Sequence, residues 1–164
     1  MTKGPNLVLF VCLLLALAVN CFFFFTGTEL TTVVTRTMFG NIIIVLTMVP
    51  IYEAIRLKSM RTAPDIAIRV KEAMKPVAIY TLLIALTTFI LFKLFGEELI
   101  AQRIAQLQEL LAAATEMAET EKQQRLDSAQ RIYAPGTQVL MVLFSTLFTG
   151  FVSSILAALV VRKG

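Results

Sequence analysis

The chain has 164 residues, of which 57% are hydrophobic, and a formal net charge of +4. A mean hydropathy of +0.79 is far above that of a water-soluble domain and indicates a small polytopic membrane protein. Histidine, the commonest metal ligand and the usual general base near neutral pH, does not occur in the sequence. We therefore expect one membrane domain over residues 1–164 and an all-α fold.

Four apolar runs are long enough to cross a hydrocarbon core about 30 Å thick, which takes about 20 helical residues. They cover residues 7–25, 33–55, 76–95 and 138–161. Both cysteines, Cys12 and Cys21, fall in the first run, so no disulfide framework is expected. The second run holds Asn41, which we expect to bond across helices, and Pro50, which should bend it.

The loop at residues 56–75 is strongly basic and sets the orientation. Because lysine and arginine collect on the cytoplasmic side, this loop and both chain termini should be cytoplasmic. Its basic residues are also candidates for contact with anionic lipid headgroups: Arg56, Lys58, Arg61, Arg69, Lys71 and Lys75. The alternative, which we favour, is that these charges serve topology alone.

A short helix at the lipid boundary is expected within this loop. It should open near Pro64 and Asp65 and stop or kink at Pro76. Apolar residues Ile66, Ile68 and Val70 alternate there with basic ones, as in a segment that rests on a membrane surface.

The segment at residues 96–136 is polar, and its helix-favouring core is free of glycine and proline between Gly96 and Pro135. The predicted orientation leaves this segment on the outer side of the membrane, and its charge agrees, because residues 93–136 carry five basic against seven acidic side chains, a net charge of −2. A straight upright helix of this length would end roughly 50 Å from the membrane. Both ends must return to the same surface, so the segment either lies along the membrane or forms a hairpin, turning within residues 118–128.

An apolar stripe follows this segment at steps of three and four. The stripe favours packing within a hairpin, docking on a partner protein, or contact with lipid, in that order. The residues expected to dock a partner are Ile100, Ile104, Leu107, Leu111 and Met117.

The last apolar run carries two rows of small residues. Such a face lets helices approach closely in lipid, where packing drives association. We expect it to pack mainly on the chain's own spans, with an interface to another subunit as the alternative. The row chosen for helix packing is Thr146, Gly150, Ser154 and Ala158, and the adjacent row is Ser145, Thr149, Ser153 and Ala157.

The layout of basic loop, acidic helical segment and small-residue final span resembles an uncharacterised family of small four-span bacterial inner-membrane proteins, grouped as a domain of unknown function. The sharpest likeness is Ala134, Pro135 and Gly136 leading into the last span. The resemblance implies a bacterial inner-membrane location and carries no catalytic residues.

The sequence offers no nucleophile motif and no carboxylate cluster, so we expect no enzyme, no cofactor and no metal site. The main hypothesis is an accessory or scaffold subunit of an inner-membrane complex. It would bind another inner-membrane protein, or a second copy, through the periplasmic segment and the small-residue face of the last span. The alternative is a small oligomeric channel or transporter for a neutral or lipid-like substrate. Lipids are the other expected partner, and nucleic acid is not one.

Overall fold

The computed structural model describes residues 3–60, 62 and 64–161, and all regular structure in these residues is helical. Six helices follow one another: α1 (Lys3–Thr26), α2 (Leu30–Lys58), α3 (Ile66–Phe95), α4 (Glu97–Ala113), α5 (Glu119–Tyr133) and α6 (Pro135–Val160). Four of them, α1, α2, α3 and α6, are long and apolar enough to cross a membrane. The chain is therefore a multi-pass membrane protein, and the four predicted spans lie within these helices except for Val161, which directly follows α6.

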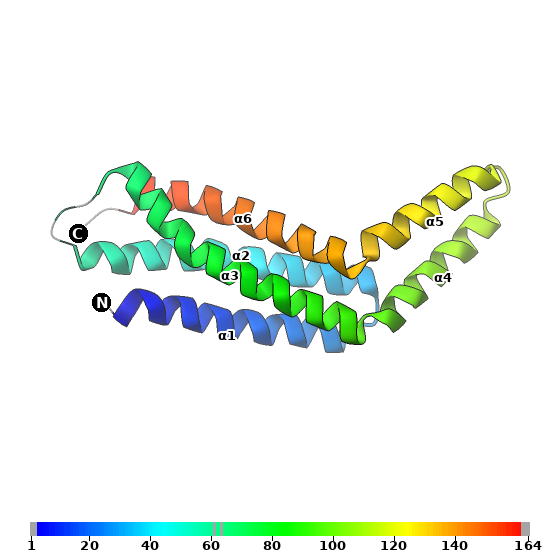
Figure 1. The fold of residues 1–164 in the computed structure, drawn as a ribbon, viewed down its shortest axis with the longest axis horizontal. Coiled ribbons are helices and arrows are strands. Elements are labelled where there is room, and N and C mark those ends of the chain that lie inside the picture. The colour runs from blue at the N-terminus through cyan, green and yellow to red at the C-terminus, as the bar shows by residue number, and fades with distance from the viewer. Residues whose placement is uncertain (1–2, 61, 63, 162–164) are drawn as a thin grey trace.

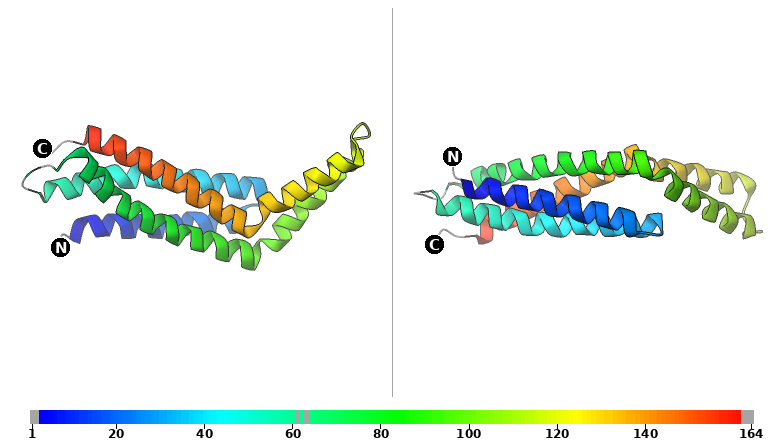
Figure 2. Two further views of the ribbon diagram at one scale, coloured as in Figure 1. Left: turned by 45° about the horizontal axis from the view of Figure 1, so that its top comes forward. Right: turned by 90° about the horizontal axis from the view of Figure 1, so that it is seen from below.

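The four long helices form an elongated bundle, in which α1 and α6 each pack against both α2 and α3 (Figure 1). Helix α1 begins and α6 ends at one end of this bundle, which also holds the α2–α3 connection and is here called the loop end. The shorter helices α4 and α5 extend from the opposite end, called the hairpin end (Figures 1 and 2).

Two apolar clusters hold the bundle together. The larger one fills the middle, where Val45 and Met48 of α2 meet Val77, Tyr80 and Ile84 of α3, all without exposed surface. The smaller one lies at the hairpin end, and it joins α1, α2 and α3 to the hairpin. Its members are Phe24, Leu30, Val33, Leu91 and Phe92, with Leu99, Ile100 and Tyr133 of the hairpin packed against them.

The helix predicted within residues 56–75 opens where expected, after Asp65, but it is not a separate element. Helix α2 extends to Lys58, and residues 66–75 form the first turns of α3, which continues through Pro76. Proline removes one backbone donor inside a helix and bends it. Figure 2 shows the first turns of α3 inclined to the rest, which agrees with the predicted kink at Pro76. Arg69, seven residues before Pro76, bonds these turns to α2 and α6.

The segment between the third and fourth spans is a helical hairpin. Its turn covers residues 114–118, ahead of the predicted residues 118–128, so that prediction was shifted by one to three helical turns. Three side-chain pairs stabilise the helix in the predicted turn region instead: Glu119–Lys122, Glu121–Arg125 and Gln123–Asp127. The resulting helices have 17 and 15 residues, so both ends return to the same level.

Two tight junctions connect the hairpin to the bundle. Helix α3 ends at Gly96, whose N–H donates to the Phe92 carbonyl, and α4 starts at the next residue. A Cβ at Gly96 would lie 2.6 Å from that carbonyl oxygen, so only glycine fits here without a shift. At the second junction, Ala134 is extended because it precedes Pro135, and this ends α5.

Side chains of α6 complete the second junction. The Thr137 hydroxyl donates to the Arg131 carbonyl and the Gln138 amide donates to the Ile132 carbonyl, at 2.7 and 2.8 Å. These bonds satisfy carbonyls that the end of α5 would otherwise leave without partners. The hairpin is thus fixed to the bundle through hydrogen bonds as well as through the apolar cluster.

Helices α3 and α6 approach most closely at Gly150, where a Cβ would collide with the side chain of Val77. In lipid, helix association depends on such packing because lipid tails are as apolar as the side chains. Substitution of Gly150 by Ala should therefore destabilise the bundle by about 1–3 kcal/mol through overpacking, measured as the unfolding midpoint in mixed detergent and sodium dodecyl sulfate.

The matched control is Gly136→Ala, in the first turn of the same helix, where an added Cβ meets no atom within 4 Å. That variant should unfold at the midpoint of the unaltered protein or slightly above it. Equal losses for the two variants would mean that the α3–α6 contact at Gly150 is not tight in the membrane protein.

Candidate functional site

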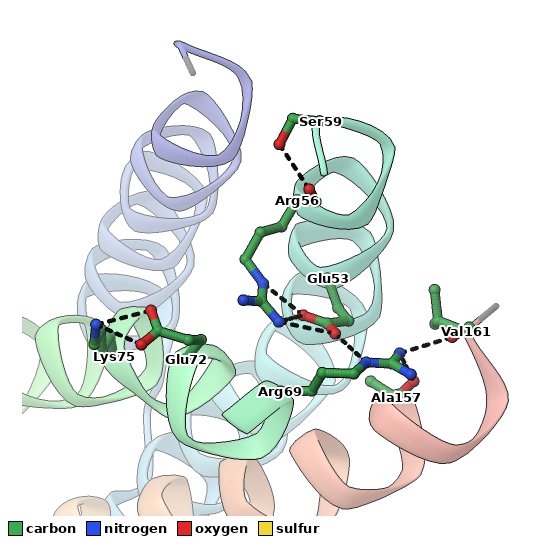
Figure 3. Close-up of polar contacts among 8 residues, drawn as sticks. All are labelled: Glu53, Arg56, Ser59, Arg69, Glu72, Lys75, Ala157 and Val161. Atoms are coloured by element: carbon green, nitrogen blue, oxygen red, sulfur yellow. Dashed lines mark hydrogen bonds and ion pairs between the residues drawn. The ribbon is translucent and has the colours of Figure 1, made fainter. Parts of the chain in front are cut away.

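The most polar buried site of the described bundle lies at the loop end, where Glu53 of α2 has no exposed surface. Arg56, one turn further along α2, donates from Nε and Nη2 to the two Glu53 oxygens, at 2.9 and 3.1 Å. Arg69 of α3 donates from Nε to Glu53 Oε1 at 2.7 Å. Figure 3 shows this arrangement, which we call the Glu53 cluster: Glu53, Arg56 and Arg69.

Arg69 also joins the cluster to the end of α6. Its Nη2 group donates to the backbone carbonyls of Val161 and Ala157, at 2.7 and 3.3 Å (Figure 3). The last carbonyls of a helix have no partner within it and carry partial negative charge, so a cation there is favourable. The side chain of Arg69, on α3, thus binds both α2 and α6.

The Glu53 cluster carries one negative and two positive charges, and all three side chains are at least nine-tenths buried. The C-terminal ends of α2 and α6 offset the extra positive charge, because each presents carbonyl oxygens. Both oxygens of Glu53 already accept hydrogen bonds from guanidinium groups, so this carboxylate is not free to act as a general base. The geometry suits a clamp on three helices better than a catalytic centre.

A second buried polar group lies in the middle of the bundle and takes one residue from each of three spans. Asn20 of α1 and Asn41 of α2 exchange two hydrogen bonds of 3.2 Å, and the Tyr80 hydroxyl of α3 donates to Asn41 Oδ1 at 2.7 Å. The remaining amide donors reach backbone carbonyls of the same helices. The predicted bonding of Asn41 across helices is therefore confirmed, and the group is satisfied internally.

The basic residues predicted to meet lipid headgroups have different surroundings. Arg56 and Arg69 belong to the buried Glu53 cluster, and Arg61 lies outside the described residues. Lys58, Lys71 and Lys75 are exposed at the loop end, where Lys75 pairs with Glu72 at 2.7 Å. Contact with headgroups remains a prediction, which these three lysines are placed to make.

All four residues of the predicted helix-packing row, Thr146, Gly150, Ser154 and Ala158, are buried, on the helix that packs against α2 and α3. In the adjacent row, Ser153 and Ala157 are buried, while Ser145 and Thr149 are half-buried. The small residues of α6 therefore serve packing within the chain, and the first row presents no surface to a second subunit.

The predicted docking stripe of α4 faces inward for much of its length. Leu111 is buried, Ile100 packs against the apolar cluster at the hairpin end, and Ile104, Leu107 and Met117 are half-buried. The large apolar side chains that the described hairpin does expose are Leu110 of α4, at 65%, and Ile132 of α5, at 46%. Neither residue belongs to the predicted docking set.

Three residues of these buried groups were missed as site residues from the sequence, Asn20, Glu53 and Tyr80. A signal for Glu53 was present, because it stands three residues before Arg56, a spacing at which opposite charges pair on one helix face. The signal for Asn20 is a lone amide in a run of apolar residues, which lipid would leave without partners. Among the described residues, no three histidine, cysteine, aspartate or glutamate side chains are grouped to hold a metal ion.

Substitution of Glu53 by Gln should be the most damaging change at the loop end. It leaves two buried guanidinium groups without a counter-charge, which costs about 3–5 kcal/mol, and the unfolding midpoint in mixed micelles measures the loss. Glu72→Gln is the matched control, because the Glu72–Lys75 pair is partly exposed and its removal should cost less than about 1 kcal/mol. Similar effects for both variants would show that the Glu53 cluster does not hold the helices.

Substitution of Asn41 by Ala should cost about 1–3 kcal/mol, because it leaves buried polar groups of Asn20 and Tyr80 without their partner. Tyr80→Phe should cost about 1 kcal/mol or less, since the Asn20–Asn41 pair survives. The combined variant should unfold no more easily than Asn41→Ala alone. Strictly additive losses would contradict a shared network.

Comparison with known proteins gives one family and no individual relative. No curated protein and no solved structure gives a significant match to the chain. Residues 8–163 match the family described as a protein of unknown function (DUF4199), which is nearly the whole chain and includes all four apolar helices. The resemblance noted in the sequence is confirmed to this extent, and the chain belongs to the DUF4199 family.

Proposed function

We propose that this protein is a non-catalytic accessory subunit of a bacterial inner-membrane complex, and that the α4–α5 hairpin is the element that engages the partner. The observation that carries the proposal is the rigid mounting of an exposed, polar hairpin on a bundle whose own buried charges are paired. The hairpin is anchored by Leu99, Ile100 and Tyr133 and by the junction at Ala134, while the rest of it projects beyond the bundle (Figure 1).

The distribution of charge supports an orientation with the hairpin in the periplasm. The exposed lysines at the loop end are Lys58, Lys71 and Lys75, which favours the cytoplasmic side for that end. Residues 97–133 carry seven acidic and four basic side chains, a net charge of −3. A partner that binds this hairpin would therefore meet it on the outer side of the inner membrane.

The exposed apolar residues of the hairpin give the proposed contact its position. Leu110 and Ile132 are more exposed than any residue of the predicted stripe. Large apolar side chains on an otherwise polar surface are common at the centres of protein interfaces. We therefore move the expected docking surface from the α4 stripe to Leu110, Ile132 and their surroundings.

A photoreactive amino acid placed at Leu110 or at Ile132 tests the proposal in native membranes. We expect one protein to be crosslinked in stoichiometric amount. The crosslink should be absent when the same amino acid replaces Phe148, which is exposed on the apolar helix α6. The double variant Leu110→Glu/Ile132→Glu should reduce the yield of a chemical crosslink to that partner by about tenfold, as expected for the loss of two interface contacts.

The matched control for the double variant is Gln102→Glu/Thr120→Glu, which adds the same charges at exposed polar positions of α4 and α5. Its crosslinking yield should equal that of the unaltered protein. Crosslinks to lipid or to a second copy alone, from both hairpin positions, would overturn the accessory-subunit proposal.

A further inference from the structure

A pocket of about 480 Å³ lies at the elbow where the hairpin leaves the bundle. Its apolar lining comes from Phe92 at the end of α3, Ile100 and Ile104 of α4, and Pro135 at the start of α6. Both chain junctions therefore border this pocket. Figures 1 and 2 show the elbow as the bend between the bundle and the α4–α5 pair.

The pocket lies at the end of the apolar spanning helix α3. Phe92 and Lys93 belong to the last turn of an apolar spanning helix, and the next residues, Leu94 and Phe95, are exposed as lipid-facing side chains are. Phe95 stacks edge to face on the exposed Phe25 of α1 at the same end. The pocket thus opens at the membrane surface, where the headgroups of one leaflet lie.

Two opposite charges line this pocket at different depths. Lys93 stands in the last turn of α3, and Glu97 stands one turn further from the bundle, in the first turn of α4. Both side chains are exposed, and the ion pairs recorded among the described residues do not join them. The amides of Gln108 and Gln130 add hydrogen-bonding groups above the apolar floor.

We infer that this elbow pocket binds a zwitterionic phospholipid with a primary ammonium group, a phosphatidylethanolamine. The phosphate of such a headgroup lies next to the glycerol, and the ammonium lies beyond it. The order of charges in the pocket matches: Lys93, the deeper residue, faces the phosphate, and Glu97 accepts hydrogen bonds from the ammonium. The apolar floor of Phe92, Ile100 and Ile104 covers the glycerol and the start of an acyl chain.

The pair of charges also distinguishes among phospholipids. A purely anionic headgroup gains from Lys93 but places negative charge beside Glu97, and like charges repel. A choline headgroup keeps the positive charge but has no N–H to donate to the carboxylate. The pocket therefore favours the ethanolamine headgroup over both, whichever leaflet the hairpin end meets.

The test is native mass spectrometry of the full-length protein, released from nanodiscs of equimolar phosphatidylethanolamine, phosphatidylglycerol and phosphatidylcholine. The unaltered protein should retain one phosphatidylethanolamine in preference to the other two lipids. Lys93→Glu should lower that retention by about fivefold, the effect of about 1 kcal/mol per basic residue at a lipid surface. Glu97→Lys should change the retained lipid to phosphatidylglycerol.

Arg131→Glu is the matched control, because it makes the same charge change on α5, at an exposed position that does not line the elbow pocket. It should retain phosphatidylethanolamine as the unaltered protein does, and unchanged unfolding midpoints show that all three variants are folded. Equal retention of the three lipids by the unaltered protein, or unchanged retention by Lys93→Glu, would overturn the inference. Neither result bears on the crosslinking at Leu110 and Ile132.

Discussion

The structure of the loop end depends on one constraint, which is that the Glu53 carboxylate is buried away from water. A buried carboxylate is costly unless its oxygens are paired, and here two guanidinium groups supply the pairing. Because those groups come from α2 and α3, and because Arg69 also reaches α6, the ends of three helices are fixed by one anion. The α2–α3 connection outside this contact needs only seven residues, 59–65.

A second buried polar group, which is uncharged, follows the same rule in the middle of the bundle. An amide in lipid must find partners inside the protein, and Asn20 finds Asn41, which in turn receives the Tyr80 hydroxyl. This network fixes α1, which otherwise packs only through apolar side chains and has no contact with α6. Two buried polar groups thus hold the helices to one another, one at the loop end and one in the middle of the bundle.

Much of the fold was predictable, because apolar length alone identifies spans and the polar segment between Gly96 and Pro135 is rich in helix formers. The position of the turn at residues 114–118 could not be predicted, since alanines there favour helix and no local residue marks a break. The side-chain pairs that follow, such as Glu121–Arg125, favour the start of α5 at this point. The hydrogen bonds of Arg69 join residues 16 and 92 positions apart in sequence. Pairing of that range leaves no periodic signal, so Arg69 was predicted only as a basic residue of the loop.

The attachment of the hairpin to α3 and α6 has a mechanical consequence. These are the two helices in closest contact, at Gly150 and Val77, and at their far ends Arg69 joins them to each other and to Glu53. Helices α5 and α6, which meet at an angle (Figure 1), have a summed length of about 60 Å at 1.5 Å per residue. A load that tilts the hairpin would therefore turn the α3–α6 pair as one lever through the membrane. The displacement would reach the opposite end of the bundle at Glu53, the anion that binds α2 to α3.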